Sequence, residues 1–362
     1  MSRERSIGNS RKSGFLLALA ASLLLSYACM SAPEHTPQPD IFWPKPPDEP
    51  RIKWVRGLRS ELEIKEASTQ EKILDAFLGE QRRGFALMKP YGVFSSNGTI
   101  YVAEMLGGVV AVFDTKTKNF HFIGSDKGPG KLVRPMGIAA DNENRVYVTD
   151  SGQNRVVVFE KSGKYLFSFG TAKQFSKPSG IAVNDQEGKV YISDQKNHKI
   201  YAFSKKGDFL FEIGKEGEKD GEFNAPTHIC VDNKNKLYVT DSLNFRVQIF
   251  DSNGKFISKF GQIGDGLGMF ARPRGVAVDS EGNIYVVDAA FANVQIFDQK
   301  GNILMFFGGS GWEPGKFLFP AGISIDEEDK IYVSDEFNKR VSIFQYMGEK
   351  YKRSTQGRPN PQ

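Results

Sequence analysis

The sequence predicts an all-β protein in which six four-stranded units close into a six-bladed β-propeller. A short motif that begins with proline recurs in six places, from Pro90, Pro135, Pro178, Pro226, Pro273 and Pro320. These prolines are spaced 43 to 48 residues apart. Each unit holds four short runs rich in Val, Ile, Tyr and Phe, and turn-forming residues separate them. Four strands in a repeat of about 45 residues are typical of propeller blades.

Particular residues also recur at fixed positions within the units. An acid ends every second strand, as Asp150 does in the second unit, and a base follows five residues later at Arg155, Lys199, Arg246 and Arg340. Phenylalanine closes every third strand, and Asn197-His198-Lys199-Ile200 is nearly the motif that names NHL repeats. Residues 85–346 therefore resemble the NHL-repeat family, which implies a six-bladed propeller, here of the exported bacterial lipoprotein type.

Two units depart from this pattern. The first has Glu104 for the aspartate and Val109 for the base, and the fifth has Asn293 at the basic position. Because the acid and the base recur in the same place, we interpret them as structural: they pair with each other or with backbone amides.

The ends of the repeat region predict how the ring closes. The second to fifth units end in Phe-Gly or Ile-Gly, but nothing comparable follows Phe344. A propeller without its last outer strand would leave an exposed strand edge. We expect the closing strand within residues 51–60 and a short amphipathic helix over 61–79, so that the propeller spans 51–346. Residues 347–362 read as a polar C-terminal tail.

The N-terminus resembles an export signal. Residues 1–28 combine a basic start, an apolar run over 15–25 and small residues before Cys29. This arrangement resembles a bacterial lipobox, although Ser26 stands where leucine is usual. We expect Cys29 to be lipidated and residues 29–50, rich in proline, to form a tether. The protein would face the periplasm from the outer membrane. Ordinary cleavage, giving a soluble periplasmic protein, is the alternative.

Removal of the signal changes the charge balance. The segment takes four basic residues and one acid with it, so the formal charge falls from +5 to about +2. Nucleic-acid-binding domains usually carry a strongly basic patch, so we expect no nucleic-acid partner.

Motifs for catalysis or cofactor binding are scarce. The glycine-rich loops lack the Gly-Lys-Ser/Thr ending of a P-loop, and no Cys-x-x-Cys-His motif for haem attachment occurs. Cys230 takes a position held elsewhere by alanine or serine, which predicts a buried, inert thiol. We expect no cofactor.

Two departures near the repeat prolines mark a candidate binding site. His228 replaces the glycine that the other five units have two residues after the proline. Basic residues precede four of the six prolines, and one more follows a proline: Lys89, Arg134, Lys177, Arg272 and Arg274. Blade geometry would gather all six side chains at one mouth of the central channel. The opposing interpretation is that nearby repeat acids, such as Asp150 or Asp194, neutralise these bases.

The leading interpretation is a non-enzymatic scaffold, anchored in the envelope, that binds a protein partner or a small anionic ligand at one face. The alternative is a metal-dependent lyase or hydrolase that acts in the channel, similar to peptidyl-hydroxyglycine lyase. That relative holds zinc with several inner-strand histidines, and here only His228 has a comparable position, so the metal site stays unassigned.

Overall fold

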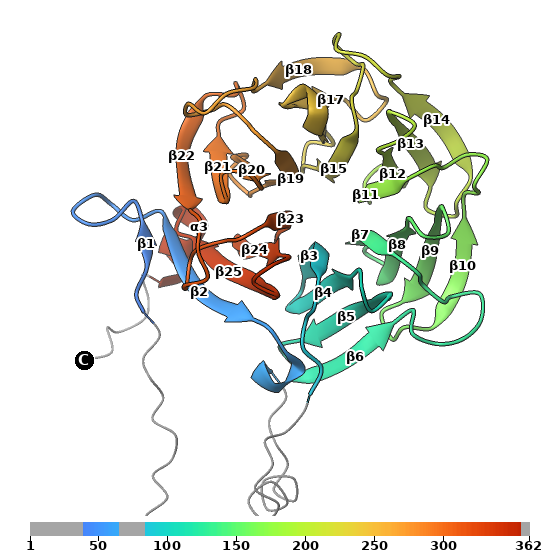
Figure 1. Ribbon diagram of the computed structural model, residues 1–362, viewed down its shortest axis with the longest axis horizontal. Coiled ribbons are helices and arrows are strands. Elements are labelled where there is room, and N and C mark those ends of the chain that lie inside the picture. Colours follow the sequence, from blue (N-terminus) through green and yellow to red (C-terminus); the bar gives the residue numbers. More distant parts are fainter. Residues whose placement is uncertain (1–38, 65–83, 356–362) are drawn as a thin grey trace, which may run out of the picture. The chain divides into compact units, whose positions relative to one another are not determined.

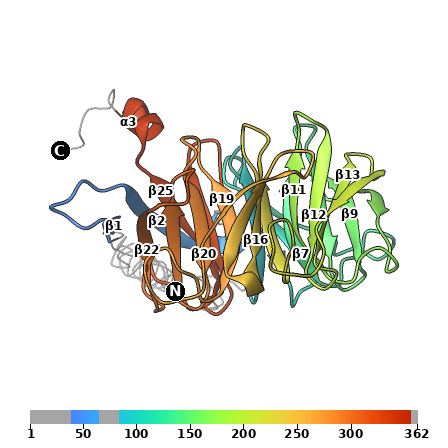
Figure 2. The same cartoon turned by 90° about the horizontal axis from the view of Figure 1, so that it is seen from above.

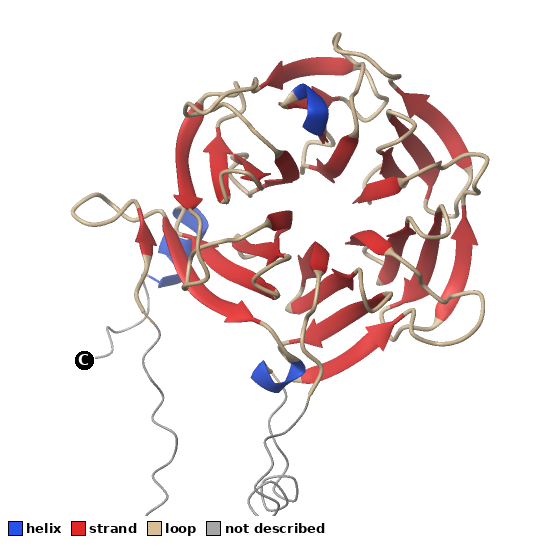
Figure 3. Cartoon of the chain, viewed as in Figure 1, coloured by secondary structure: helices blue, strands red, loops and turns tan. Residues whose placement is uncertain are grey.

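The computed structural model describes residues 39–64 and 84–355. In these ranges the chain forms six antiparallel sheets arranged around a central axis (Figure 1). Among the described residues, strands dominate and helix is confined to short segments (Figure 3). The predicted six-bladed β-propeller is therefore confirmed.

The first three blades each contain four strands. Blade one consists of β3 (Pro90–Ser96), β4 (Thr99–Glu104), β5 (Val109–Asp114) and β6 (Asn119–Ile123). Blade two consists of β7 (Pro135–Ala140), β8 (Arg145–Asp150), β9 (Arg155–Glu160) and β10 (Tyr165–Phe169). Blade three consists of β11 (Pro178–Asn184), β12 (Lys189–Asp194), β13 (Lys199–Ser204) and β14 (Phe209–Ile213).

The last three blades follow the same order. Blade four consists of β15 (Pro226–Val231), β16 (Leu237–Asp241), β17 (Arg246–Phe250) and β18 (Phe256–Phe260). Blade five consists of β19 (Pro273–Val278), β20 (Ile284–Asp288), β21 (Asn293–Phe297) and β22 (Ile303–Gly308). Blade six contains β23 (Pro320–Ile325), β24 (Lys330–Asp335) and β25 (Arg340–Tyr346), together with β1 (Phe42–Trp43) and β2 (Ile52–Leu58).

The innermost strands pack closely around the axis, and this explains the recurring glycine. A Cβ atom on Gly92 would lie 2.0 Å from the Met136 carbonyl oxygen of the next blade, and one on Gly275 would lie 2.7 Å from that of Ala321. Side chains are therefore excluded from most of these contacts. His228 stands at the corresponding position of β15, facing blade five.

The apolar core lies between neighbouring blades. Each core cluster combines residues from the facing sheets of two blades, and the phenylalanines that close the third strands are fully buried among them. Figure 2 shows the blades side by side in one layer around the axis. This packing holds the inner strands, and therefore the channel, in fixed positions.

The ring closes through the N-terminal strand, as predicted. β2 pairs antiparallel with β25, from Ile52 opposite Tyr346 to Leu58 opposite Val341. Both ends of the described chain thus meet in blade six, where blue β2 lies beside red β25 (Figure 1). The side chains of Ile52, Trp54 and Leu58 are buried, so this strand belongs to the core.

The sheet also extends into the proline-rich segment expected to be a tether. β1 pairs with β2, and the Trp43 ring lies 5.9 Å from the Phe307 ring and 5.8 Å from the Phe344 ring. Ordered structure therefore begins before residue 51, where the sequence places the start of the propeller.

Three short helical segments accompany the strands in the described ranges. Within the expected helix over 61–79, the structure describes one 3₁₀ turn, η1 (Glu61–Glu63), and residues 65–83 lie outside the described residues. A second 3₁₀ turn, η2 (Ser242–Asn244), lies in blade four, and α3 (Glu349–Thr355) forms in the tail expected to be only polar. None of the helices in the described ranges is long and apolar enough to cross a membrane. The expected signal peptide and Cys29 lie outside these ranges.

Candidate binding site at the channel mouth

The starts of the innermost strands surround one mouth of the central channel. A cavity of about 480 Å³ opens there, and its lining includes all five basic residues singled out in the sequence: Lys89, Arg134, Lys177, Arg272 and Arg274. The structure thus brings together side chains that the sequence separates by up to 185 residues. Whether they bind a ligand stays a prediction.

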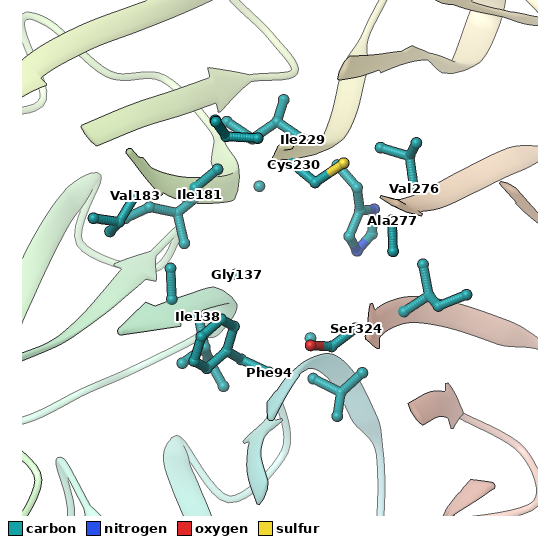
Figure 4. A pocket seen from close by; sticks show the side chains of 18 of the residues that line it. Phe94, Gly137, Ile138, Ile181, Val183, Ile229, Cys230, Val276, Ala277 and Ser324 are labelled. Carbon is teal, nitrogen blue, oxygen red and sulfur yellow. The ribbon is translucent and has the colours of Figure 1, made fainter. Parts of the chain in front are cut away.

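A narrower cavity of about 170 Å³ lies between the inner strands and has His228 and Cys230 in its lining. Side chains of several blades, including Ile138, Ile181 and Ala277, surround this opening (Figure 4). His228 therefore lies in the channel lining, and its neighbour Thr227 lines the wider mouth. Neighbouring residues of β15 therefore line the two cavities.

The repeat acids do not neutralise the side chains at the mouth. Asp150 accepts hydrogen bonds from the backbone amides of Val133 at 3.1 Å and Arg134 at 2.9 Å. The same arrangement joins each other acid to the backbone before its repeat proline, at Glu104, Asp194, Asp241, Asp288 and Asp335. All six carboxylates are fully buried. They fix the loop that carries the basic residues, and the proposed pairing of Asp150 or Asp194 with those side chains is wrong.

The bases that follow the acids also have structural contacts. Arg246 pairs with Asp241 at 2.8 Å, whereas the Arg340 guanidinium donates to the carbonyl oxygens of Trp312 and Glu313 at 3.0 and 2.9 Å. Arg155 donates to the carbonyl oxygen of Lys131 at 3.0 Å. Of these three bases, one therefore pairs with its acid, and the other two hold loop carbonyls.

Glu336 forms ion pairs with two of the five cations at the mouth. Its side chain is 5% exposed, and it lies 2.5 Å from the Arg274 guanidinium and 3.7 Å from the Lys89 ammonium. Arg274 also lies over the rings of Tyr91 and Phe319, at 5.7 and 4.4 Å. Arg274 is therefore held by packing as well as by charge.

The other three cations at the mouth remain available to a ligand. Arg134, Lys177 and Arg272 are exposed, and within the described residues none of them forms an ion pair with a carboxylate. The Arg272 guanidinium lies 4.9 Å from the centre of the Phe319 ring, which attracts the cation but carries no formal negative charge. The mouth therefore keeps three positive charges on blades two, three and five.

His228 is buried and uncharged. It is 8% exposed, and its ring stacks on Tyr91 with the ring centres 5.3 Å apart. Burial, and then the nearby charge of Arg274, lower the pKa of His228 to about 3. Among the described residues, the ring makes one weak polar contact, with the Arg274 backbone, which opposes this lowering of the pKa; neither nitrogen has a well-formed hydrogen bond. A neutral imidazole offers one donor and one acceptor, and at least the acceptor remains for a group in the channel.

Cys230 is the other polarisable group in the channel. The residue is partly exposed and lines the cavity, whereas the sequence predicts a buried thiol. Burial by its surroundings, and then the charge of Asp232, raise the pKa of the thiol well above its ordinary value. The protonated thiol is a poor nucleophile, which agrees with the expected inert role.

Two residues of the site were missed from the sequence. Glu336 directly follows a repeat acid, where the other blades have Met105, Ser151, Gln195, Ser242 and Ala289. That single acidic departure from the repeat is a usable signal. Tyr91 gave no such signal, because the residue after the repeat proline differs in every blade. No group of three His, Cys, Asp or Glu side chains suited to a metal ion occurs in the described ranges.

Comparisons with known proteins agree with this architecture. The family described as "6-bladed beta-propeller" matches residues 170–236, 233–292 and 280–356, and the family described as "NHL repeat" matches residues 132–159. No curated protein matches the sequence.

Solved structures show the same fold at low identity. A structural genomics protein of unknown function from Bacteroides thetaiotaomicron is 21% identical with a TM-score of 0.58, covering 72% of this chain and 70% of that one. An auxiliary nutrient binding protein from the same organism is 14% identical with a TM-score of 0.57 and the same coverage. A catalytically inactive virginiamycin B lyase from Staphylococcus aureus, with quinupristin, is 15% identical with a TM-score of 0.54, covering 71% and 94%.

Proposed function

The chain belongs to the six-bladed β-propeller family, and from this premise we propose that it is a non-enzymatic binding module for an anionic group. The anion, a carboxylate on a protein partner or a small ligand, binds at the channel mouth. The observation that carries this proposal is the set of three exposed, uncompensated cations, Arg134, Lys177 and Arg272, around one cavity.

The chemistry of the mouth supports an anion more than a neutral ligand. Arginine presents a planar fork of donors that matches a carboxylate, and such charge-assisted bonds are stronger than neutral ones. The backbone below Arg134 and Arg272 is fixed by buried repeat acids, so these side chains start from a defined position. Because Glu336 holds Arg274 and Lys89, these two residues shape the mouth and the other three contact the anion.

A nutrient-binding role in one solved neighbour is compatible with this proposal, although the likeness shows only the fold. The alternative, a metal-dependent lyase or hydrolase, finds its support in His228 and in the fold shared with a lyase. Metal analysis of the purified protein separates the two functions. Stoichiometric zinc or calcium that is lost in His228→Ala would favour the enzyme.

Charge reversal at the mouth tests the binding site. We expect Arg272→Glu to weaken the binding of citrate, a carboxylate-rich probe, at least tenfold in a titration at low salt, because one attractive contact becomes repulsive. Lys300→Glu is the matched control. It makes the same charge change in the turn between β21 and β22, at the end of these strands away from the mouth. Equal citrate affinity in both variants and the wild type would move the anion site elsewhere.

The proposal includes an anchor at the periplasmic side of the outer membrane, through a lipid on Cys29. We expect Cys29→Ser to move the protein from the membrane fraction to the soluble periplasm, because the apolar run that precedes Cys29 is removed with the signal. Cell fractionation followed by immunoblotting measures the shift. A wild-type protein found already in the soluble fraction would show that ordinary cleavage is correct.

A further inference from the structure

His228 lies in the lining of the narrow cavity, next to a residue that lines the wide mouth. It lies on β15 between Thr227, in the lining of the wide mouth, and Cys230, in the lining of the narrow channel. The Tyr91 ring stacks on the imidazole face, so contacts to the nitrogens come from the edge of the ring. The other five blades have glycine at this position, so the propeller fold itself does not require a histidine here.

The hydrogen-bonding groups of the His228 ring define which chemical group could bind to it. Buried polar atoms are nearly always hydrogen-bonded, and the His228 ring has only a weak contact with the Arg274 backbone, so a partner from outside the chain is indicated. A neutral imidazole needs one acceptor and one donor. A carboxylate supplies acceptors alone, and a hydrocarbon supplies neither. A water molecule or an amide supplies both, and of these two only the amide can also be part of an anionic ligand.

The size of the channel limits what can enter. Pockets for drug-sized ligands usually have about 300–1,000 Å³, and the narrow cavity has about 170 Å³. A small group or the end of a chain fits, whereas a folded segment does not. The innermost strands also turn their unpaired edges toward this space, which offers backbone donors and acceptors to an amide.

We infer that the ligand is a chain end in which an amide lies next to a carboxylate, as in an N-acyl amino acid or the C-terminus of a peptide. This inference rests on the proposed anion site: the carboxylate binds the cations of the mouth, and the neighbouring amide binds the edge of His228. The contact of His228 with the amide then selects this ligand class over simple anions, which the rim alone would accept.

The experiment compares two probes that differ by the amide: acetate and N-acetylglycine. Nuclear magnetic resonance titration follows both the affinity and the ring signals of His228. We expect the wild type to bind N-acetylglycine about tenfold more tightly than acetate, the factor that one or two neutral hydrogen bonds provide. His228→Gly should reduce the affinity for N-acetylglycine to that for acetate and leave the acetate affinity unchanged. Arg272→Gln should weaken the binding of both probes.

His228→Gly is a matched variant, because glycine is the residue of the other five blades. The ring signals of the wild type give a second readout that needs no variant: they should shift with N-acetylglycine and not with acetate. Equal affinity for the two probes would overturn the inference and leave the anion site in place. So would His228 ring signals that shift with neither probe. Failure of both probes to bind the wild type would overturn the proposed function itself.

Discussion

Deletion of residues 30–58 is expected to unfold the propeller in water at room temperature, whereas deletion of residues 30–38 is expected to leave its stability unchanged. The longer deletion removes β2 and with it three buried apolar side chains, Ile52, Trp54 and Leu58. Burial of one such side chain stabilises a fold by about 1.5–3 kcal/mol, so the loss approaches the whole stability of a typical domain, about 5–15 kcal/mol. It also exposes the edge of β25.

Urea unfolding followed by circular dichroism measures this effect, and size-exclusion chromatography reports association through the exposed edge. A third variant, lacking residues 30–45, should fall between the two. The proline content of this segment predicts no contribution to stability, but Trp43 packs on Phe307 and Phe344. Equal urea midpoints for the deletions of 30–38 and 30–58 would show that β2 is dispensable.

The closing strand could be predicted because a repeat can be counted. Four units end in Phe-Gly or Ile-Gly and the sixth does not, so a strand had to come from elsewhere in the chain. β1 could not be found in this way. It has two residues, Phe42 and Trp43, in a proline-rich segment, and it forms only because β2 offers an edge beside an apolar surface. Such a strand leaves no periodic pattern in the sequence.

The candidate site was predictable to the same extent. Positions relative to the repeat prolines placed five basic side chains at one mouth, because every blade repeats the same geometry. The charge that remains there could not be derived from spacing. The buried carboxylates bind backbone amides instead of the neighbouring bases, and Glu336, outside the repeat pattern, compensates Arg274 and Lys89. Both sets of contacts depend on the directions in which the side chains point, and the spacing of residues in the sequence does not specify these directions.

The stability of the wild-type protein is expected to fall on acidification between about pH 6.5 and pH 3 more steeply than that of His228→Gly. In the unfolded chain the imidazole binds a proton below its ordinary pKa of 6.5, but in the folded protein burial and the charge of Arg274 lower this pKa to about 3. Between these values the unfolded state holds one proton more, so falling pH favours unfolding. Above pH 6.5 both states are neutral at this site and the contribution disappears.

The size of this effect makes it measurable. Linkage gives a slope of up to about 1.4 kcal/mol per pH unit, or about 2.5 kcal/mol between pH 6 and pH 4. The charged groups near His228, Arg274 and its partner Glu336, are present in both proteins, so their contributions cancel in the difference. Urea unfolding of both proteins at pH 7, 6, 5 and 4 gives the two stability curves, which should diverge below pH 6.5. Parallel curves would mean that His228 accepts a proton in the folded channel. The histidine would then be a fourth cation of the site, and its selection of an amide over a simple anion would fail with it.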